Sequence, residues 1–378
     1  MLAPERPLTI SIFHDVDDAR ERWLALQERA MAAPFQTLEW CERLYAGPGE
    51  AQGAAPLIVI IRDRTTRRDV ALLPLALGAR GNLSVITFAD FGLSDYAFPM
   101  IARDSDFSGA DLARLWPDIL AGLPKADLVH FDKLPARHEG LDNPVMGLGG
   151  ASVMKLGAWA LKLPEGWLDY QAILGRKARR DLRRKARKLA STARMKVFLA
   201  RRGEDAGRLM DSLRRMRAER FRALGRADAL GGDAAHAFYR GLAESGAGGM
   251  PMLSAMKVNG EVCAIVFGLL RGARFYMLAL TFAHGDRELA KCSPGLVLVH
   301  ETMAELHKHE LKTYDFTIGD EYYKKLFKAR RFELFEILQP LSARGKLFAM
   351  THKARRRASR FKQEMLSRLP RSAGRGRK

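Results

Sequence analysis

Ionisable side chains cluster where a strand-like apolar run ends, in the segment TYDFTIGDEYYKK (313–325). Asp315 lies inside the run, and four ionisable residues follow it closely: Asp320, Glu321, Tyr323 and Lys324. A carboxylate near an attacking amine can act as general base, a lysine can stabilise an oxyanion or a phosphate, and a phenol can protonate a leaving group. We expect Asp320 or Glu321 to be the base and Lys324 and Tyr323 to fill the other roles. The alternative is a turn capped by Asp315 among solvated charges.

A second candidate site begins immediately before a helical repeat of apolar residues, and it comprises Ser293, Pro294, Gly295 and Leu296. Ser293 can cap the helix, Pro294 suits its first position, and Gly295 would let a ligand approach the free amides closely. Because such amides bind phosphate, we expect residues 293–296 to hold the pyrophosphate of a cosubstrate. A plain helix cap is the alternative.

The elements around these residues predict an alternation of strands and helices in the second half. Helical stretches are expected over residues 169–190 and 205–224. The segments MLSAMKV and EVCAIVFGLL flank Asn259-Gly260, which is typical of a type I′ hairpin turn. RFYMLALTF adds a third strand, the helix after Ser293 follows, and TYDFTIG returns as a strand. ELFEILQPL (333–341) is expected to be the last strand of this half.

The first half has the same mixed character. A helix is expected over residues 17–31 and another near 112–120, with a hairpin formed by residues 56–61 and 70–77. The segments NLSVITFA and DLVHFDKL supply further strands. At 378 residues the chain fits two domains, so we expect an α/β domain over residues 1–163, a second over 164–341, and a basic helix and tail over 342–378.

The net charge of +20 is concentrated in two segments. Residues 176–188 carry nine Lys or Arg and one Asp, and residues 341–378 carry thirteen and one Glu, which together account for the whole excess. A neutral body with two basic segments favours local contacts with anions over a surface that grips a polyanion throughout.

The tail combines its charge with a helical apolar pattern formed by Met350, Ala354, Ala358, Phe361, Met365 and Leu369. A basic amphipathic helix could lie on anionic lipid, contact nucleic acid, or pack its stripe on the body. The final RSAGRGRK is expected to be disordered.

Several classes of protein find no support in the sequence. There is no run of about 20 uncharged residues for a membrane span and no signal-peptide pattern, so we expect a cytoplasmic protein. Three widely spaced cysteines predict no disulfide framework and no zinc site. No acidic or cysteine partner completes a metal site with His300, His307 and His309, so no metal is expected. No Walker loop or nucleophile elbow occurs.

Separated motifs nevertheless resemble one known family in the order it shows: PFQTLEW, Asp95-Tyr96 in FGLSDY, FDKLP (131–135), RKARRDLRRKARKL, SPGLVLVHE and YDFTIGDEYYKKLF. The chain resembles the CelD/BcsL-like group of GNAT-superfamily acetyltransferases linked to cellulose and exopolysaccharide synthesis and, more distantly, the Fem peptidyltransferases. The order of three strands, a helix and a strand agrees with how GNAT domains hold coenzyme A, although the usual glycine-rich loop is absent. The basic tail has no counterpart in the resemblance.

The resemblance implies tandem GNAT-like α/β domains with mixed sheets and a substrate cleft between them. It implies acetyl-CoA as donor, held mainly by the second domain, and an amine or hydroxyl of a sugar or envelope-polymer precursor as acceptor. Candidate substrate contacts are Asp95, Tyr96, Asp315 and Arg180. An enzyme using aminoacyl-tRNA is the nearest alternative, and a non-enzymatic protein binding nucleic acid or membrane is another. The basic segments would serve tRNA or the inner membrane face, and no stable nucleic-acid complex is expected.

Overall fold

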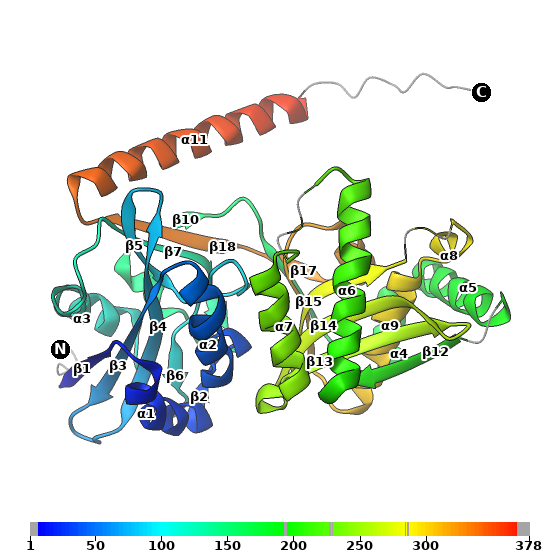
Figure 1. The fold of residues 1–378 in the computed structure, drawn as a ribbon, viewed down its shortest axis with the longest axis horizontal. Coiled ribbons are helices and arrows are strands. Elements are labelled where there is room, and N and C mark those ends of the chain that lie inside the picture. The colour runs from blue at the N-terminus through cyan, green and yellow to red at the C-terminus, as the bar shows by residue number, and fades with distance from the viewer. Residues whose placement is uncertain are drawn as a thin grey trace.

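The computed structural model describes residues 7–368, apart from residues 193–194, 227, 229, 284 and 286 and the side chains of 192, 287 and 359–368. Two mixed sheets form the centres of two halves that lie side by side (Figure 1). The predicted disordered end, residues 371–378, lies outside the described residues, as do the side chains of Phe361 and Met365 and all of Leu369.

The first sheet has the strand order β1-β3-β4-β5-β7-β18-β10, and β2 and β6 attach beside β4. Its strands are β1 (Leu8–Phe13), β2 (Ala30–Met31), β3 (Ala55–Asp63), β4 (Asp69–Arg80), β5 (Leu83–Phe88), β6 (Met100–Ala102), β7 (Leu128–Pro135), β10 (Ser152–Val153) and β18 (Leu334–Pro340). Its helices are α1 (Val16–Arg29), α2 (Leu38–Leu44) and α3 (Gly109–Gly122). The short strands β8 (Arg137–His138) and β9 (Leu141–Asp142) form a separate ribbon.

The second sheet has the order β12-β13-β14-β15-β16-β11-β17. Its strands are β11 (Ala158–Lys162), β12 (Met195–Ala200), β13 (Pro251–Val258), β14 (Glu261–Arg271), β15 (Arg274–Phe282), β16 (Thr313–Ile318) and β17 (Arg330–Phe332). Its helices are α4 (Trp167–Leu174), α5 (Arg176–Thr192), α6 (Gly203–Ala223), α7 (Asp233–Ser245), α8 (Arg287–Lys291), α9 (Pro294–Lys308) and α10 (Tyr322–Leu326). Helix α11 (Ala343–Arg368) follows β18 of the first sheet.

The two sheets share one topology. Each begins with an edge strand followed by two helices, continues through an antiparallel meander, and then crosses over a helix to a parallel strand, β5 to β7 in the first half and β15 to β16 in the second. The predicted tandem α/β architecture is therefore confirmed.

Each half also lends a strand to the other. β18, late in the chain, pairs with β7 in the first sheet, and β11, from the middle of the chain, pairs with β16 in the second. The three predicted domain ranges stay a prediction, but β11 and β18 each join the sheet on the other side of the boundary drawn at residue 163. Position in the sequence does not indicate these pairings, because a strand can join any sheet edge that is free, including one formed by a distant segment.

The predicted hairpin at Asn259-Gly260 is present. Both residues have positive φ, +53° and +90°, and Val258 pairs with Glu261 across the turn. The single helix predicted over residues 169–190 is wrong, because Gly175, with φ of +87°, divides it into α4 and α5. Helix α7 and strand β12 were not expected from the sequence.

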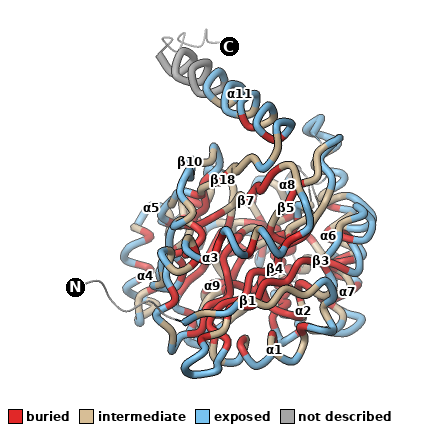
Figure 2. Tube along the Cα trace, turned by 90° about the vertical axis from the view of Figure 1, so that its left-hand side faces the viewer, coloured by how far each residue is buried: buried red, intermediate tan, exposed pale blue. Residues whose placement is uncertain are grey.

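An apolar cluster joins the two halves. Phe35, from the PFQTLEW motif, packs against Tyr276 with ring centroids 6.0 Å apart, and Trp40 packs against Phe238 at 4.9 Å. The buried residues run through the interior of both halves (Figure 2). Because this interface is aromatic and buried, it should hold the halves in a fixed relation.

Within the described residues, no helix is both long and apolar enough to cross a membrane. Helix α11 extends from the end of β18 alongside the first half (Figure 1).

Candidate active site

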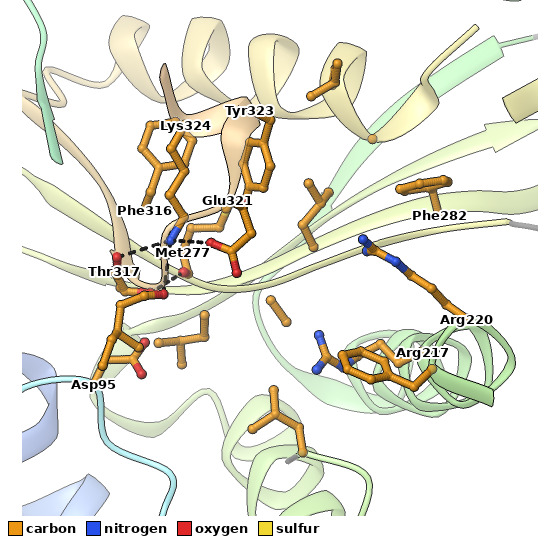
Figure 3. A pocket seen from close by; sticks show the side chains of 18 of the residues that line it. Asp95, Arg217, Arg220, Met277, Phe282, Phe316, Thr317, Glu321, Tyr323 and Lys324 are labelled. Atoms are coloured by element: carbon orange, nitrogen blue, oxygen red, sulfur yellow. Dashed lines mark hydrogen bonds and ion pairs between the residues drawn. The ribbon is translucent and has the colours of Figure 1, made fainter. Parts of the chain in front are cut away.

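The site is built on a divergence between two parallel strands. β15 and β16 pair only from Arg274 opposite Thr313 to Tyr276 opposite Asp315. Beyond these pairs, the strands line a cavity of about 660 Å³ together with α6, α9, α10 and the loop that carries Asp95. Figure 3 shows Asp95 on one side of this cavity and Arg217 and Arg220 on the other.

The divergence leaves backbone groups available to a ligand. Met277, Leu278, Ala279, Leu280 and Phe282 of β15 line the cavity, and within the described chain no strand pairs with this side of β15 past Tyr276. Backbone amides need partners, and an extended ligand that itself contains amides could occupy such an edge like an added strand.

Asp315 stabilises the divergence from behind the cavity wall. It is fully buried, and its Oδ1 accepts hydrogen bonds from the Tyr96 hydroxyl and the Thr317 amide, both at 2.8 Å, while Oδ2 accepts from Arg274 at 2.8 Å. Thr317 has φ of +54°, so the carboxylate holds a bend at the cavity wall. Burial raises the pKa of Asp315, with Arg274 and Tyr96 opposing the shift. Asp315 and Tyr96, predicted as substrate contacts, do not line the cavity.

The N-terminus of α9 opens onto the cavity through Ser293, Gly295 and Leu296, whereas Pro294 is buried outside its lining. Ser293 occupies the N-cap position, but the expected side-chain cap is wrong: Ser293 has φ of +49° and its hydroxyl makes no capping hydrogen bond. Its carbonyl instead accepts from the amides of Leu296 and Val297. Gly295 is the second residue of α9, where an amide has no partner within the helix, so one helix N-terminal donor faces the cavity and can bind an anion.

Gly295 packs closely against side chains of β15. A Cβ there would lie 3.0 Å from Cδ1 of Phe282 and 3.4 Å from Cδ1 of Leu280. A larger residue would therefore press on side chains of β15 that line the cavity.

Asp95 is the ionisable group in the cavity best suited to accept a proton. Burial raises its pKa to about 6, and the neighbouring Lys133 and Thr317 only partly offset this effect. Lys133 is itself held by Asp90 and by the carbonyl of Ser94, each at 2.7 Å. A carboxylate with this pKa is mostly ionised at neutral pH yet basic enough to take a proton from a nucleophile.

Tyr323 lines the same cavity as a proton donor. Burial raises the pKa of its phenol well above the usual value, the Glu321 carboxylate raises it further, and Arg220 and Arg217 oppose the shift. The phenol therefore keeps its proton at neutral pH and is a weaker acid than a free tyrosine, and its O–H can donate a hydrogen bond to a developing anion.

Lys324 and Glu321 are engaged with each other and with the backbone. The Lys324 ammonium is buried, contacts Glu321 Oε2 at 2.9 Å, and donates to the carbonyls of Thr317, Ile318 and Gly319 at 2.9–3.2 Å (Figure 3). Four oxygen partners surround this cation, so it fixes the strand end, and little of its charge is left for a substrate. Glu321 lines the cavity and is half exposed.

Two predicted residues lie outside the cavity. Asp320 accepts from Trp159 Nε1 at 2.9 Å and Arg331 Nε at 3.0 Å; partial burial opposes ionisation, but these two donors outweigh it and lower the pKa of Asp320. Such a carboxylate is a poor base. Arg180 is exposed on α5 and does not line the cavity.

The structure adds four basic residues that sequence reasoning did not assign to the site: Lys133, Arg217, Arg220 and Arg226. Arg217 forms an ion pair with Asp228, and Arg220 lies over the Phe282 ring at 5.2 Å with no ion pair to a described residue. A signal was present, because Arg217, Arg220 and Leu224 recur at helical spacing and so share one face of α6.

Among the described residues, no group of three or more His, Cys, Asp or Glu side chains is placed to hold a metal ion. Of the histidines singled out in the sequence, His300 interacts with Gln171 at 2.9 Å, and His307 with the Pro164 carbonyl at 2.9 Å.

Comparison with known proteins places this cavity in context. Residues 176–325 match the family model described as an acetyltransferase (GNAT) domain, which includes α6, α9, the diverging strands and Tyr323. No curated protein matches the chain.

Solved structures resemble the whole two-sheet arrangement. FemX matches with a TM-score of 0.58 at 12% identity, covering 87% of this chain and 97% of that chain. The C-terminal domain (DUF2156) of a protein described as a lysylphosphatidylglycerol synthetase from Agrobacterium fabrum matches with a TM-score of 0.52 at 10% identity, covering 89% and 95%. L-PGS from Bacillus licheniformis gives 0.51 at 11%, covering 88% and 96%. At these identities the likeness shows the fold alone.

Proposed function

We propose, from the premise that residues 176–325 form a GNAT-type acyltransferase domain, that the protein transfers an acetyl group from acetyl-CoA to an amine or hydroxyl. The observation that carries the proposal is the cavity between β15 and β16, which combines an unpaired strand edge, a helix N-terminus, a basic Asp95 and a protonated Tyr323.

The cavity fits the separate parts of such a donor. The amide-containing arm of coenzyme A would lie along the free edge of β15, and its pyrophosphate would meet the Gly295 amide and Arg220. The acetyl thioester would then lie at the end of the cavity nearest Asp95 and Tyr323.

The two ionisable side chains divide the proton transfers between them. The attacking nitrogen or oxygen forms a bond to the thioester carbonyl carbon and gives its proton to Asp95, directly or through one water. As the carbon–sulfur bond breaks, Tyr323 donates its proton to the departing sulfur, and the products are the acetylated acceptor and the free thiol. Bulk solvent returns the proton from Asp95 to Tyr323 before the next turnover.

The proposed acceptor is a sugar or an envelope-polymer precursor, because the motifs in the chain resemble the CelD/BcsL-like group linked to exopolysaccharide and cellulose synthesis. Such precursors are assembled in the cytoplasm, which is where we place the enzyme. Asp95 would also attract a protonated amine to the cavity before it accepts the proton.

An aminoacyl-tRNA donor is the second candidate, and one observation favours it. α5 presents many exposed cations, and the Nζ atom of its Lys188 lies 3.9 Å from Oε2 of Glu288 in α8. α8 directly precedes α9, whose N-terminus faces the cavity. A basic helix near the cavity entrance could contact an RNA backbone.

Binding measurements separate the two donors. Calorimetric titration should show acetyl-CoA binding to the parent, with affinity falling roughly 10- to 100-fold in Arg220→Gln through loss of a charged hydrogen bond. Arg222→Gln is the matched control, because Arg222 lies exposed on the same helix and does not line the cavity.

Transfer itself is followed by mass spectrometry of an acceptor panel of amino sugars and nucleotide sugars. Thermal stabilisation by tRNA but by no acyl-CoA would contradict the acetyl-CoA proposal and support the second candidate.

A further inference from the structure

Helix α11 is fixed to the body by one of its faces. The Ser342 hydroxyl accepts a hydrogen bond from the Gly345 amide at 3.1 Å and so caps the start of the helix. Gly345 packs so closely on the body that a Cβ there would collide with the Asp127 carbonyl. About three turns later, Arg356 forms an ion pair with buried Glu336 and donates to the Ser152 hydroxyl at 3.0 Å. The body-facing side thus includes Gly345, Ala349 and Arg356.

The opposite face of the same helix is apolar and uncovered. Leu347 and Met350 are 65% and 69% exposed, and Ala354 and Ala358 are exposed as well. At about 100° per residue these positions lie within roughly 80° of one another and point away from Ala349 and Arg356. The sequence predicted this stripe, but packing of Met350, Ala354 and Ala358 on the body, one of three alternatives, is wrong.

Cations border this apolar stripe on both sides. Lys346, Lys353 and Arg357 lie along one edge, and Arg355 lies along the other. Arg344 lies beside Arg355 and also donates to the Asn82 carbonyl of the body. All five side chains are exposed. The described part of the helix with side chains, residues 343–358, contains no acidic residue. Figure 2 shows α11 projecting from the body with most of its described surface exposed.

We propose that the outward face of α11, with Leu347 and Met350 at its centre, docks the protein on an anionic lipid bilayer. An apolar stripe bordered by cations matches the boundary between acyl chains and acidic headgroups, where the stripe is buried and the cations remain in contact with phosphate. The body-side anchor at Glu336 holds the stripe outward, so docking needs no rearrangement of the fold.

The chemistry of this face disfavours the other occupants. Nucleic acid would pair with the cations but would leave the two exposed apolar side chains without a partner. A second copy of the chain would bring two basic helices together, with like charges opposed along both edges.

The test is flotation of the full chain with vesicles of phosphatidylcholine, alone or mixed with phosphatidylglycerol. The parent should bind only the mixed vesicles, and salt should weaken the binding. The double variant Leu347→Glu, Met350→Glu should lower the vesicle partition coefficient roughly 100-fold or more, because two apolar side chains leave the bilayer and two negative charges enter.

Leu168→Glu is the matched control, since Leu168 is 80% exposed on α4, in the other half of the molecule, and undergoes the same substitution. It should bind vesicles like the parent. Circular dichroism should show that all variants stay folded, as expected for exposed positions.

Three results would overturn the proposal. The double variant could bind mixed vesicles as tightly as the parent. The parent could fail to bind vesicles yet bind duplex RNA or DNA in a way that Lys353→Glu weakens and Leu347→Glu does not. Sedimentation could instead show a dimer that the double variant dissociates, with no vesicle binding by the parent.

Discussion

The two halves place a helix after the same strand of the same topology, but only one leaves that helix open at its start. In the first half, α3 begins with a capping box: the Ser108 hydroxyl accepts from the Asp111 amide at 3.3 Å, and the Asp111 carboxylate accepts from the Ser108 amide at 3.0 Å. In the second half, α9 begins at Ser293 with no side-chain cap and with Gly295 facing a cavity.

The diverging strands differ in the same way. Just beyond the paired residues of β5 and β7, Phe88 and Phe131 pack with ring centroids 4.9 Å apart, and Trp116 of α3 covers Phe131 at 5.7 Å. The corresponding ends of β15 and β16 line the open cavity. The comparison teaches that topology alone does not determine where a binding site lies. A site forms where side chains neither cap the helix amides nor fill the space between the strand ends.

The largest effect is expected for Asp95→Asn. Asp95 belongs to the first half, yet it would supply the general base for the cavity of the second half. Turnover should fall roughly 10²- to 10⁴-fold with little change in donor affinity. In the parent, kcat/KM should decline below about pH 6 as Asp95 becomes protonated. Steady-state kinetics across pH measure both, and full activity in the variant would place the base elsewhere.

The same substitution carries a stability signature. The pKa of Asp95 is raised on folding, so ionisation of Asp95 destabilises the folded state. This destabilisation is complete above about pH 6 and disappears as the pH falls toward the unfolded pKa near 4. Asp95→Asn should therefore raise the free energy of unfolding by about 1–3 kcal/mol at pH 7 and much less at pH 4. Urea unfolding at the two pH values checks the sign.

Gly295→Val should close the open helix start and make the second half resemble the first. Its side chain would press on Phe282 and Leu280, and acetyl-CoA affinity should fall roughly 10- to 100-fold. Calorimetry gives the affinity, and a melting curve shows whether the variant is folded. A folded variant with the parent's affinity would mean that the donor does not pass between α9 and β15.

Substitution of the two serines should affect stability to different extents if the Ser108 side chain caps its helix and the Ser293 side chain does not. Ser108→Ala removes a cap and should lower the free energy of unfolding by about 1 kcal/mol with no effect on donor affinity. Ser293→Ala removes no capping bond and should change stability by less than about 0.5 kcal/mol. Equal stability losses in denaturant titrations would remove the distinction between the helices.

The smallest effect is expected for Asp320→Asn. Asp320 faces Trp159 and Arg331 outside the cavity, so turnover should stay within roughly two- to threefold of the parent. Because the change matches Asp95→Asn in chemistry, it serves as that variant's control. A large loss of turnover would restore Asp320 as a candidate base, as the sequence suggested.

Local signals made parts of this molecule predictable. The Asn259-Gly260 turn fixes its hairpin with two residues, and the apolar spacing after Ser293 defines α9. Residues in the order expected for an acyltransferase do reach one cavity, including Ser293, Glu321 and Tyr323.

The remainder depended on contacts between distant segments. Asp95 reaches the cavity only because the two halves pack through an aromatic interface, and its raised pKa is a property of that burial. Asp320 is adjacent to Glu321 in the sequence, yet its carboxylate accepts a hydrogen bond from Trp159 of β11, the strand that pairs with β16. The partners of Lys324 are backbone carbonyls, which sequence patterns do not indicate.

The exchange of β11 and β18 between the sheets has a consequence for how the protein is made. During synthesis, β7 is complete about 200 residues before β18, its neighbour in the sheet, and at 5–20 residues per second this interval lasts roughly 10 to 40 seconds. Throughout that time the nascent first half presents an unpaired strand edge. β18, the last strand of the described residues, fills the place between β7 and β10 in the first sheet, so both halves should reach their finished state together.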